Sequence, residues 1–210
     1  VNPRCNDTYS QGLNATNSSP FHVNFRPSFT SFYNNGPANP GASITFFSTS
    51  TDPDTVGGED TLVLHVCEQN DFSTTTSLCG PGGTIATTTV PVTANATASF
   101  TLPAIIQDDV YDAYGFIVDQ HGHTATGGAQ GSNQGYTVNN VAPTVAAGQI
   151  SINGGLDLVL SVPAGQTTGF TLDFETSDAN SCENVFAGDE ITGYSASLFR
   201  TSIGTSTCTG

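Results

Sequence analysis

The segment 108–125, DDVYDAYGFIVDQHGHTA, contains the most informative strand pattern of the chain. Three acidic residues and Tyr111 stand before the short apolar run 114–118, which begins with a second tyrosine and is followed by Asp119-x-x-Gly122. Apolar runs of this length, bounded by Asp and Gly, are typical of β-strands that end in a tight turn. The segment therefore predicts a buried strand followed by a hairpin.

Segments of the same kind lie on both sides of it. They are short, rich in β-branched and aromatic residues, and separated by clusters of Gly, Pro, Asn and Asp. The expected strands are 28–33, 43–51, 61–68, 84–92, 96–103, 111–119 and 135–140. About seven short strands at this spacing predict one complete β-sandwich over 28–142.

The motif in 108–125 resembles the penultimate strand and final hairpin of bacterial surface immunoglobulin-like repeats. These are the PKD, fibronectin type III and cadherin-like kinds. The resemblance implies that Tyr111 or Tyr114 is a corner tyrosine, and that Asp119 to Gly122 form the hairpin turn. The chain lacks the core Trp and the intersheet cysteine pair of antibody domains. The resemblance implies a fold and not a function.

Residues 143–210 predict a second, smaller set of strands. The expected strands are 148–155, 156–165, 167–178 and 191–202. Four strands make half of a sandwich, and its closing strands are missing from the pattern. We therefore expect an all-β chain with two immunoglobulin-like sandwiches in tandem, the second of which is incomplete and completed by a neighbouring copy.

Residues 1–27 are expected to be an N-terminal extension that ends in a strand over 20–26. Its sequence SPFHVNFRPSF (19–29) is similar to GYTVNNVAPTV (135–145), which closes the first sandwich. Phe21, Val23 and Phe25 alternate with polar residues, so the strand has one apolar face. Such a strand can complete the open sheet of another copy, and the contact is head to tail.

The pattern leaves several arrangements open. Separate subunits can polymerise by strand exchange, or the chain can be one repeat of a longer tandem protein. Alternatively, residues 1–27 form a leader whose strand folds back on its own molecule. The functional expectation is a structural subunit or repeat of an extracellular filament, stalk or surface layer. The alternative is an adhesin or glycan-binding module, in which the loop 71–83 presents an exposed Phe72.

Composition limits the partners. The net charge is −15, with three Arg and no Lys. Nucleic acid and anionic membrane surfaces are poor partners for such a chain, because binding phosphate requires cations. The apolar runs are too short to span a bilayer, so no membrane insertion is expected. The start at Val1, without a signal peptide, suggests a processed protein or an excised piece.

Five cysteines without a CxxC pair favour disulfides in an oxidising compartment over a zinc site. Cys67 and Cys79 are expected to close a short loop after a strand. The other pairings stay open: Cys182 with Cys208 inside one chain and Cys5 with another chain, or Cys5 with Cys208 across a junction.

The chain also carries four sequons for N-linked glycans. They lie at Asn6, Asn14, Asn17 and Asn95. Together with the cysteines they predict an extracellular or cell-surface glycoprotein.

The acidic turn 51–60, TDPDTVGGED, is a candidate calcium site. Asp52, Asp54, Glu59 and Asp60 could supply hard oxygen ligands, although their spacing does not match an EF-hand loop. The other interpretation is an ordinary acidic turn, because Asp and Gly favour turn geometry. No cofactor is required by the pattern.

His121 and His123 flank a glycine and could bind a transition metal, but a solvated turn beside an exposed Asp119 is the favoured interpretation. No enzyme is expected, because the chain has no GxSxG nucleophile motif and no phosphate-binding glycine loop. The adjacent carboxylates at 108–109 and 189–190 would point to opposite faces of a strand.

Overall fold

The chain is all-β in the computed structural model, which describes residues 24–54, 60–156, 169–180, 191 and 193–197. These residues contain strands, two short 3₁₀ turns and no α-helix, as the composition predicts. No helix within these ranges is long and apolar enough to cross a membrane.

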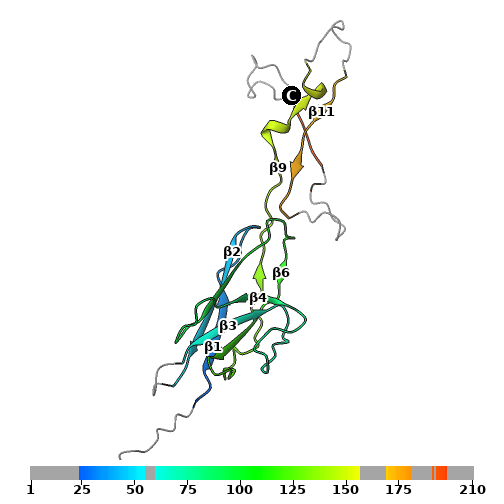
Figure 1. Ribbon diagram of the computed structural model, residues 1–210. Helices are drawn as coiled ribbons and strands as arrows, with labels where there is room; N and C mark the ends of the chain where they lie inside the picture. Colours follow the sequence, from blue (N-terminus) through cyan, green and yellow to red (C-terminus); the bar gives the residue numbers. More distant parts are fainter. Residues whose placement is uncertain (1–23, 55–59, 157–168, 181–190, 192, 198–210) are drawn as a thin grey trace, which may run out of the picture.

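Two three-stranded antiparallel sheets form a sandwich (Figure 1). The first sheet has the order β1 (Ser28–Asn34), β2 (Ser43–Thr51), β5 (Thr97–Thr101). The second has the order β4 (Thr84–Thr87), β3 (Leu62–Cys67), β7 (Tyr114–Asp119). A small ladder joins β6 (Val110–Tyr111) to β8 (Tyr136–Thr137).

Most predicted strands of the sandwich are confirmed, with two differences in length. The expected strand 84–92 is shorter in the structure, because β4 ends at Thr87. Beyond it, Val92 makes one isolated bridge to Leu62. Pro91 lies in the missing part, and proline cannot donate to a ladder. The expected strand 111–119 is divided into β6 and β7, because the Ala113 amide donates to the Asn133 side chain (3.1 Å) instead of to a neighbouring strand.

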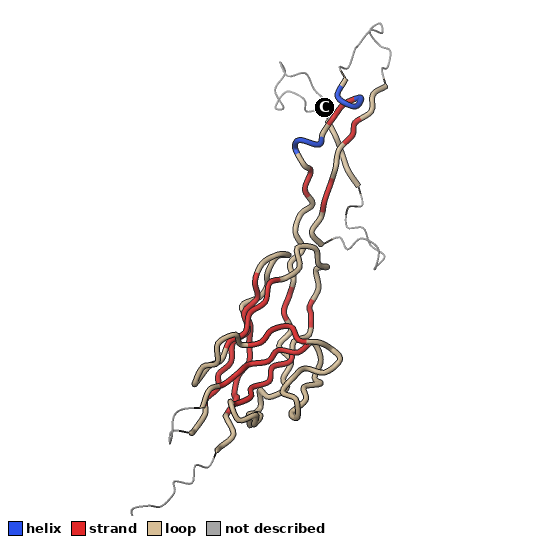
Figure 2. The backbone as a smooth tube through the Cα atoms, viewed as in Figure 1, coloured by secondary structure: helices blue, strands red, loops and turns tan. Residues whose placement is uncertain are grey.

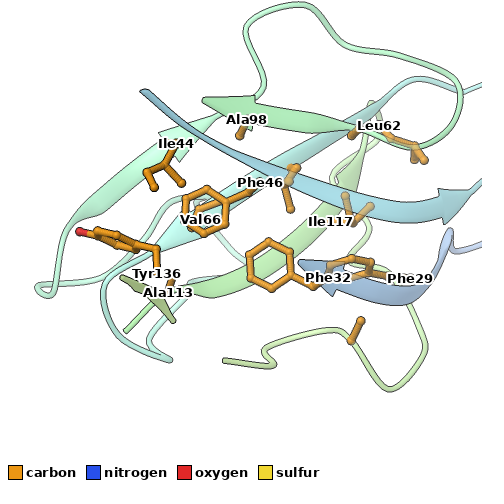
Figure 3. Close-up of a cluster of buried hydrophobic side chains, with 14 of the residues drawn as sticks. Phe29, Phe32, Ile44, Phe46, Leu62, Val66, Ala98, Ala113, Ile117 and Tyr136 are labelled. Atoms are coloured by element: carbon orange, nitrogen blue, oxygen red, sulfur yellow. The ribbon is translucent and has the colours of Figure 1, made fainter. Parts of the chain in front are cut away.

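The core lies between the two sheets and is built from alternate residues of each strand. In β2 the inward positions are Ile44, Phe46, Ser48 and Ser50, which matches the period of two. The Phe46 ring stacks on Phe32 of β1 with centroids 5.6 Å apart (Figure 3). Burying large side chains of this kind contributes about 1.5–3 kcal/mol each, which makes the sandwich the stable part of the described chain.

Two glycines allow close packing against β1. At Gly115 in β7 a Cβ would lie 2.8 Å from the Phe32 ring, so a larger residue would push the sheets apart. At Gly127 the backbone has φ +118°, and a Cβ would lie 2.3 Å from the Phe29 carbonyl oxygen. Only glycine adopts this conformation without strain.

The predicted corner and hairpin are both confirmed. The Tyr111 hydroxyl donates to the Gln107 carbonyl, 3.0 Å away and four residues upstream, as a corner tyrosine does. The hairpin is closed by the Gly122 amide, which donates to the Asp119 carbonyl at 3.1 Å. Gly122 has φ +84°, which explains the glycine at this position.

The described elements after residue 143 form two separate two-stranded antiparallel ladders (Figure 2). They are β9 (Thr144–Val145) with β12 (Thr176–Ser177), and β10 (Ser151–Ile152) with β11 (Leu172–Asp173). The 3₁₀ turns η1 (Ala147–Gln149) and η2 (Asn153–Gly155) flank β10. The expected strand 148–155 is therefore mostly turn, since Gly154 and Gly155 adopt positive φ.

The other three strands that were expected after residue 143 also differ from the structure or lie largely outside the described residues. The expected strand 167–178 is divided into β11 and β12. Ile191 and residues 193–197 are not in a strand, so the expectation for 191–202 is wrong over those residues. The expected strand 156–165 lies outside the described residues except for Leu156, which follows a turn.

A buried asparagine joins these ladders to the sandwich. Asn180 is 2% exposed, and its Oδ1 accepts from the Val141 amide at 2.7 Å. Its Nδ2 donates to the carbonyl oxygens of Ile106 and Asn139, both at 3.1 Å. One side chain thus bridges three backbone groups of the sandwich end.

Candidate functional site

Three carboxylates converge at the end of the sandwich that lies away from the ladders. Asp52 follows β2, Asp60 precedes β3 and Asp119 ends β7. Because β3 and β7 are antiparallel with Leu62 opposite Asp119, the start of one strand lies beside the end of the other. One carboxylate oxygen of each aspartate lies within 4.8 Å of the other two. We call this set the acidic cluster.

Two oxygens of the acidic cluster are buried without a hydrogen-bond donor among the described residues: Asp52 Oδ2 and Asp60 Oδ2. The other oxygen of each group is held in place. The Asp54 amide donates to Asp52 Oδ1 at 2.9 Å, and Gln120 Nε2 donates to Asp60 Oδ1 at 2.5 Å. His121 Nε2 lies 3.4 Å from Asp60 Oδ2, which is an ion pair only when that imidazole is protonated.

Asp119 is the most buried member, with a side chain that is 0% exposed. Its Oδ1 accepts from the amides of His121 and His123 at 2.9 and 2.8 Å. Its Oδ2 accepts from Asn24 Nδ2 at 3.0 Å. The expectation of an exposed Asp119 beside the histidine turn is wrong, because the turn folds its amides over this carboxylate.

The acidic cluster concentrates negative charge in a partly buried environment. Burial raises the pKa of Asp52 above its ordinary value, and repulsion from Asp54, Asp60 and Asp119 adds to this rise. The hydrogen bond from the Asp54 amide opposes it. The described ion pairs of the cluster are made with His121 and His123, which are not permanently charged. A divalent cation would suit this arrangement.

The predicted calcium ligands are only partly brought together. Asp52 and Asp60 meet, whereas Asp54 directs its Oδ2 to the Phe25 amide at 2.7 Å and is not in the cluster. Glu59 lies outside the described residues. Asp119 was missed because it is far away in sequence. The available signal was the strand pairing, which brings the acidic turn and the end of 111–119 to one edge.

The second feature is an open apolar groove of about 520 Å³ on the ladders. Its large apolar members are Val145, Ile150, Ile152, Leu172, Phe174, Ile191 and Tyr194. Tyr194 is 80% exposed and Ile150 is 53% exposed, so much of this apolar surface faces solvent. The Tyr194 ring packs edge-on against Phe174 at 5.3 Å. We call this surface the apolar groove.

The predicted donor strand is described only at its end. Asn24, Phe25 and Arg26 are not in a strand, and Phe25 is 56% exposed. Phe21 and Val23 lie outside the described residues. The described part of the segment is tied to the acidic end of its own sandwich through Asn24 and Phe25.

Of the cysteine predictions, the Cys67–Cys79 disulfide is confirmed. It joins the end of β3 to the loop that precedes β4. Cys5, Cys182 and Cys208 lie outside the described residues, and their pairing stays open.

Of the four sequons, Asn95 is described and exposed, and its Oδ1 accepts from the Ser50 amide at 3.3 Å. Asn6, Asn14 and Asn17 lie outside the described residues.

The loop predicted to contact a glycan packs on the sandwich. Phe72 is half-buried, and its ring stacks on Phe116 with centroids 4.8 Å apart. Its centroid also lies 5.2 Å from the centroid of the His65 ring. The expectation of an exposed Phe72 is therefore wrong. One face of its ring is already covered and cannot receive a sugar.

No protein-family profile matches this sequence, and no curated protein is similar enough to it to count as a relative. Function therefore has to be argued from the two sites themselves.

Proposed function

We propose that this chain is a structural unit of an extracellular filament, stalk or surface layer. In this proposal residues 20–26 of one copy add a strand to the ladders of the next copy, head to tail. The observation that carries the proposal is the apolar groove, which is open on ladders that have two strands each among the described residues. The same contact serves separate subunits and consecutive repeats of a tandem chain.

The ladders need further strands for physical reasons. An isolated two-stranded ladder is marginal in water, and a third strand or a covering layer is required for independent stability. The groove also exposes aromatic and aliphatic side chains such as Ile150 and Tyr194. An added strand would pair with free main-chain groups and would cover these side chains at the same time.

Residues 20–26 have the chemistry of such a strand. Phe21, Val23 and Phe25 alternate with polar residues, so one face of an extended segment is apolar. Burying three side chains of this size contributes roughly 5–8 kcal/mol before ordering costs are subtracted. Phe25 is 56% exposed in the single molecule, so this ring is available for a contact.

Chain reach favours a second copy as the acceptor. Asn24 is bonded to Asp119 at the acidic end of the sandwich, and the ladders are attached at the other end through Asn180 (Figure 1). The strand β1 alone spans roughly 20 Å between these ends. Phe21 is three residues from Asn24, a reach of about 11 Å. While Asn24 stays in place, Phe21 cannot reach the groove of its own molecule.

The experiment compares two variants with equal added charge. Phe21→Asp with Val23→Asp places two carboxylates on the apolar face of the segment. Pro20→Asp with His22→Asp adds the same number of carboxylates at positions that alternate with the apolar ones and therefore lie outside that face. We expect the unsubstituted chain and the second variant to form head-to-tail oligomers in sedimentation velocity and negative-stain images. The first variant should be monomeric.

A mixing experiment tests the direction of the contact. Ile150→Asp with Tyr194→Asp places two charges in the apolar groove and leaves residues 20–26 unchanged, so this chain can donate its strand but cannot accept one. The chain with Phe21→Asp and Val23→Asp can only accept. Each should be monomeric alone, and their mixture should form one-to-one dimers and no longer species. Assembly of the acceptor-only chain by itself, or a monomeric unsubstituted chain at every concentration, would show that the proposal is wrong.

A further inference from the structure

We propose that Asp52, Asp60 and Asp119 together bind one calcium ion. The inference is independent of strand exchange, because the acidic cluster lies at the opposite end of the sandwich from the apolar groove. It rests on two separate observations: the convergence of three carboxylates, and two buried carboxylate oxygens, one on Asp52 and one on Asp60, that have no hydrogen-bond donor among the described residues.

The orphaned oxygens are the stronger observation. Asp60 is 5% exposed, and its Oδ2 has no hydrogen-bond donor in the described part of the chain. Asp52 Oδ2 is buried and equally without a donor there. Buried polar atoms are nearly always satisfied, and an exception of this kind calls for a water or an ion. His121 Nε2, 3.4 Å from Asp60 Oδ2, pairs with it only when the imidazole is protonated, so a permanent partner for these carboxylate oxygens has to be a cation or a donor.

The other hydrogen bonds of the three aspartates fix the orientation of their carboxylates, as a metal site requires. The Asp54 amide and Gln120 Nε2 each fix one oxygen of an aspartate and leave the other oxygen for the cluster. Asp119 is fixed by the amides of the hairpin turn, yet its oxygens keep lone pairs that can accept more. Outer contacts of this kind orient metal ligands in protein sites.

The ligand type and spacing favour calcium over other cations. Three carboxylates are hard oxygen donors, which suit Ca²⁺ or Mg²⁺ better than zinc. Two oxygens on one Ca²⁺ can be as far apart as about 5 Å, but on one Mg²⁺ only about 4 Å. The cluster oxygens all lie within 4.8 Å of one another, a separation that one Ca²⁺ can span. Calcium also accepts irregular geometry and water ligands, which an arrangement of three protein groups requires.

Binding would fix three chain segments to one another. The ion would tie the end of β2 to the start of β3 and to the end of β7, and Asp119 in turn holds Asn24. The cation therefore stabilises the sandwich at the point where the N-terminal segment leaves it. It also offsets the repulsion among three like charges.

The test uses the full chain freed of metal with EGTA and then titrated with CaCl₂ in physiological NaCl. We expect a one-site isotherm by calorimetry and a rise in melting temperature on the order of 5 °C at saturating calcium. Asp60→Asn should weaken binding at least about tenfold and remove the rise. Asp112→Asn is the matched control, because it removes the same charge from an exposed residue outside the cluster. It should bind calcium as the unsubstituted chain does.

Other outcomes would overturn the inference. These are the absence of binding heat together with an unchanged melting temperature, an equal rise with MgCl₂, or an equal rise in the Asp60→Asn and Asp112→Asn chains. If Asp60→Asn does not fold, Asp52→Asn in the half-buried position replaces it with the same expectation. Repeating the titration on the chain with Phe21→Asp and Val23→Asp separates a failed calcium site from failed assembly.

Discussion

The Asn180 bridge gives the sharpest prediction about how the two parts of the chain are coupled. The perturbation is Asn180→Ala, which removes one acceptor and two donated hydrogen bonds at a residue that is 2% exposed. The Val141 amide loses its acceptor, and the carbonyls of Ile106 and Asn139 lose their donors.

The magnitude follows from those three bonds. Each contributes about 1 kcal/mol net, and water entering the opened joint recovers part of the loss. The closed joint should therefore be weakened by about 2–3 kcal/mol, which corresponds to roughly 30- to 150-fold in its opening equilibrium. The hydrogen exchange rate of the Val141 amide should rise by that factor, because exchange there requires the joint to open.

Hydrogen exchange measured by NMR checks this prediction at single amides. The Leu64 amide, which donates to Thr88 Oγ1 at 2.9 Å in the core, should exchange as before. Asn139→Ala is the control variant, because its side chain bonds only Asn39 in the described contacts while its carbonyl stays in place. Unchanged Val141 exchange in Asn180→Ala, or an equal change in Asn139→Ala, would refute the argument that this side chain couples the two parts.

Three further perturbations concern the sandwich itself. Gly127→Ala should lower the free energy of unfolding by about 3 kcal/mol in urea titrations, because the φ of +118° and a Cβ contact of 2.3 Å both exclude a side chain. In the control Gly128→Ala, where the added Cβ meets open space, the free energy of unfolding should change by less than about 1 kcal/mol. Burial lowers the pKa of His65 below 6.5, so the folded state resists protonation there and stability should fall as the pH drops below 6.5. In His65→Gln that part of the pH dependence should vanish from melting curves recorded at constant salt. Replacing Cys67 and Cys79 together by Ser opens a loop with a sequence separation of 12 and should cost about 3 kcal/mol, whereas an unchanged melting temperature would contradict the loop-closure argument.

The strands of the sandwich could be predicted because their signal is local. The bounds of β2 match the expected 43–51, since Ile44 and Phe46 alternate with residues on the outer face. The prediction failed where the signal is not local. Division of the expected strand 111–119 depends on the Asn133 side chain, which captures the Ala113 amide from twenty residues away. After residue 143 the same alternation yields ladders of two residues per strand within the described segments, where no wide sheet extends them.

The acidic cluster also separates what a local sequence pattern can predict from what depends on the tertiary structure. Asp52 and Asp60 were identified from their turn, because acidic residues close in sequence are easily seen as a group. Asp54 was included from the same turn, but the structure places it outside the cluster, with its Oδ2 accepting from the Phe25 amide. Asp119 was assigned to a solvated turn, although it is the most buried carboxylate of the three. Its role depends on the register of β3 with β7, which no pattern within either segment specifies.

The sequence by itself determined the all-β class, the positions of most sandwich strands, the Asp119–Gly122 turn and the Cys67–Cys79 loop. Each of these depends on periodicity, turn chemistry or short spacing along the chain. Only the tertiary structure decided which carboxylates meet, that Phe72 is covered, and that Asn180 bridges the two parts. These features depend on strand register and on distances between segments remote in sequence, which are fixed when the whole core packs.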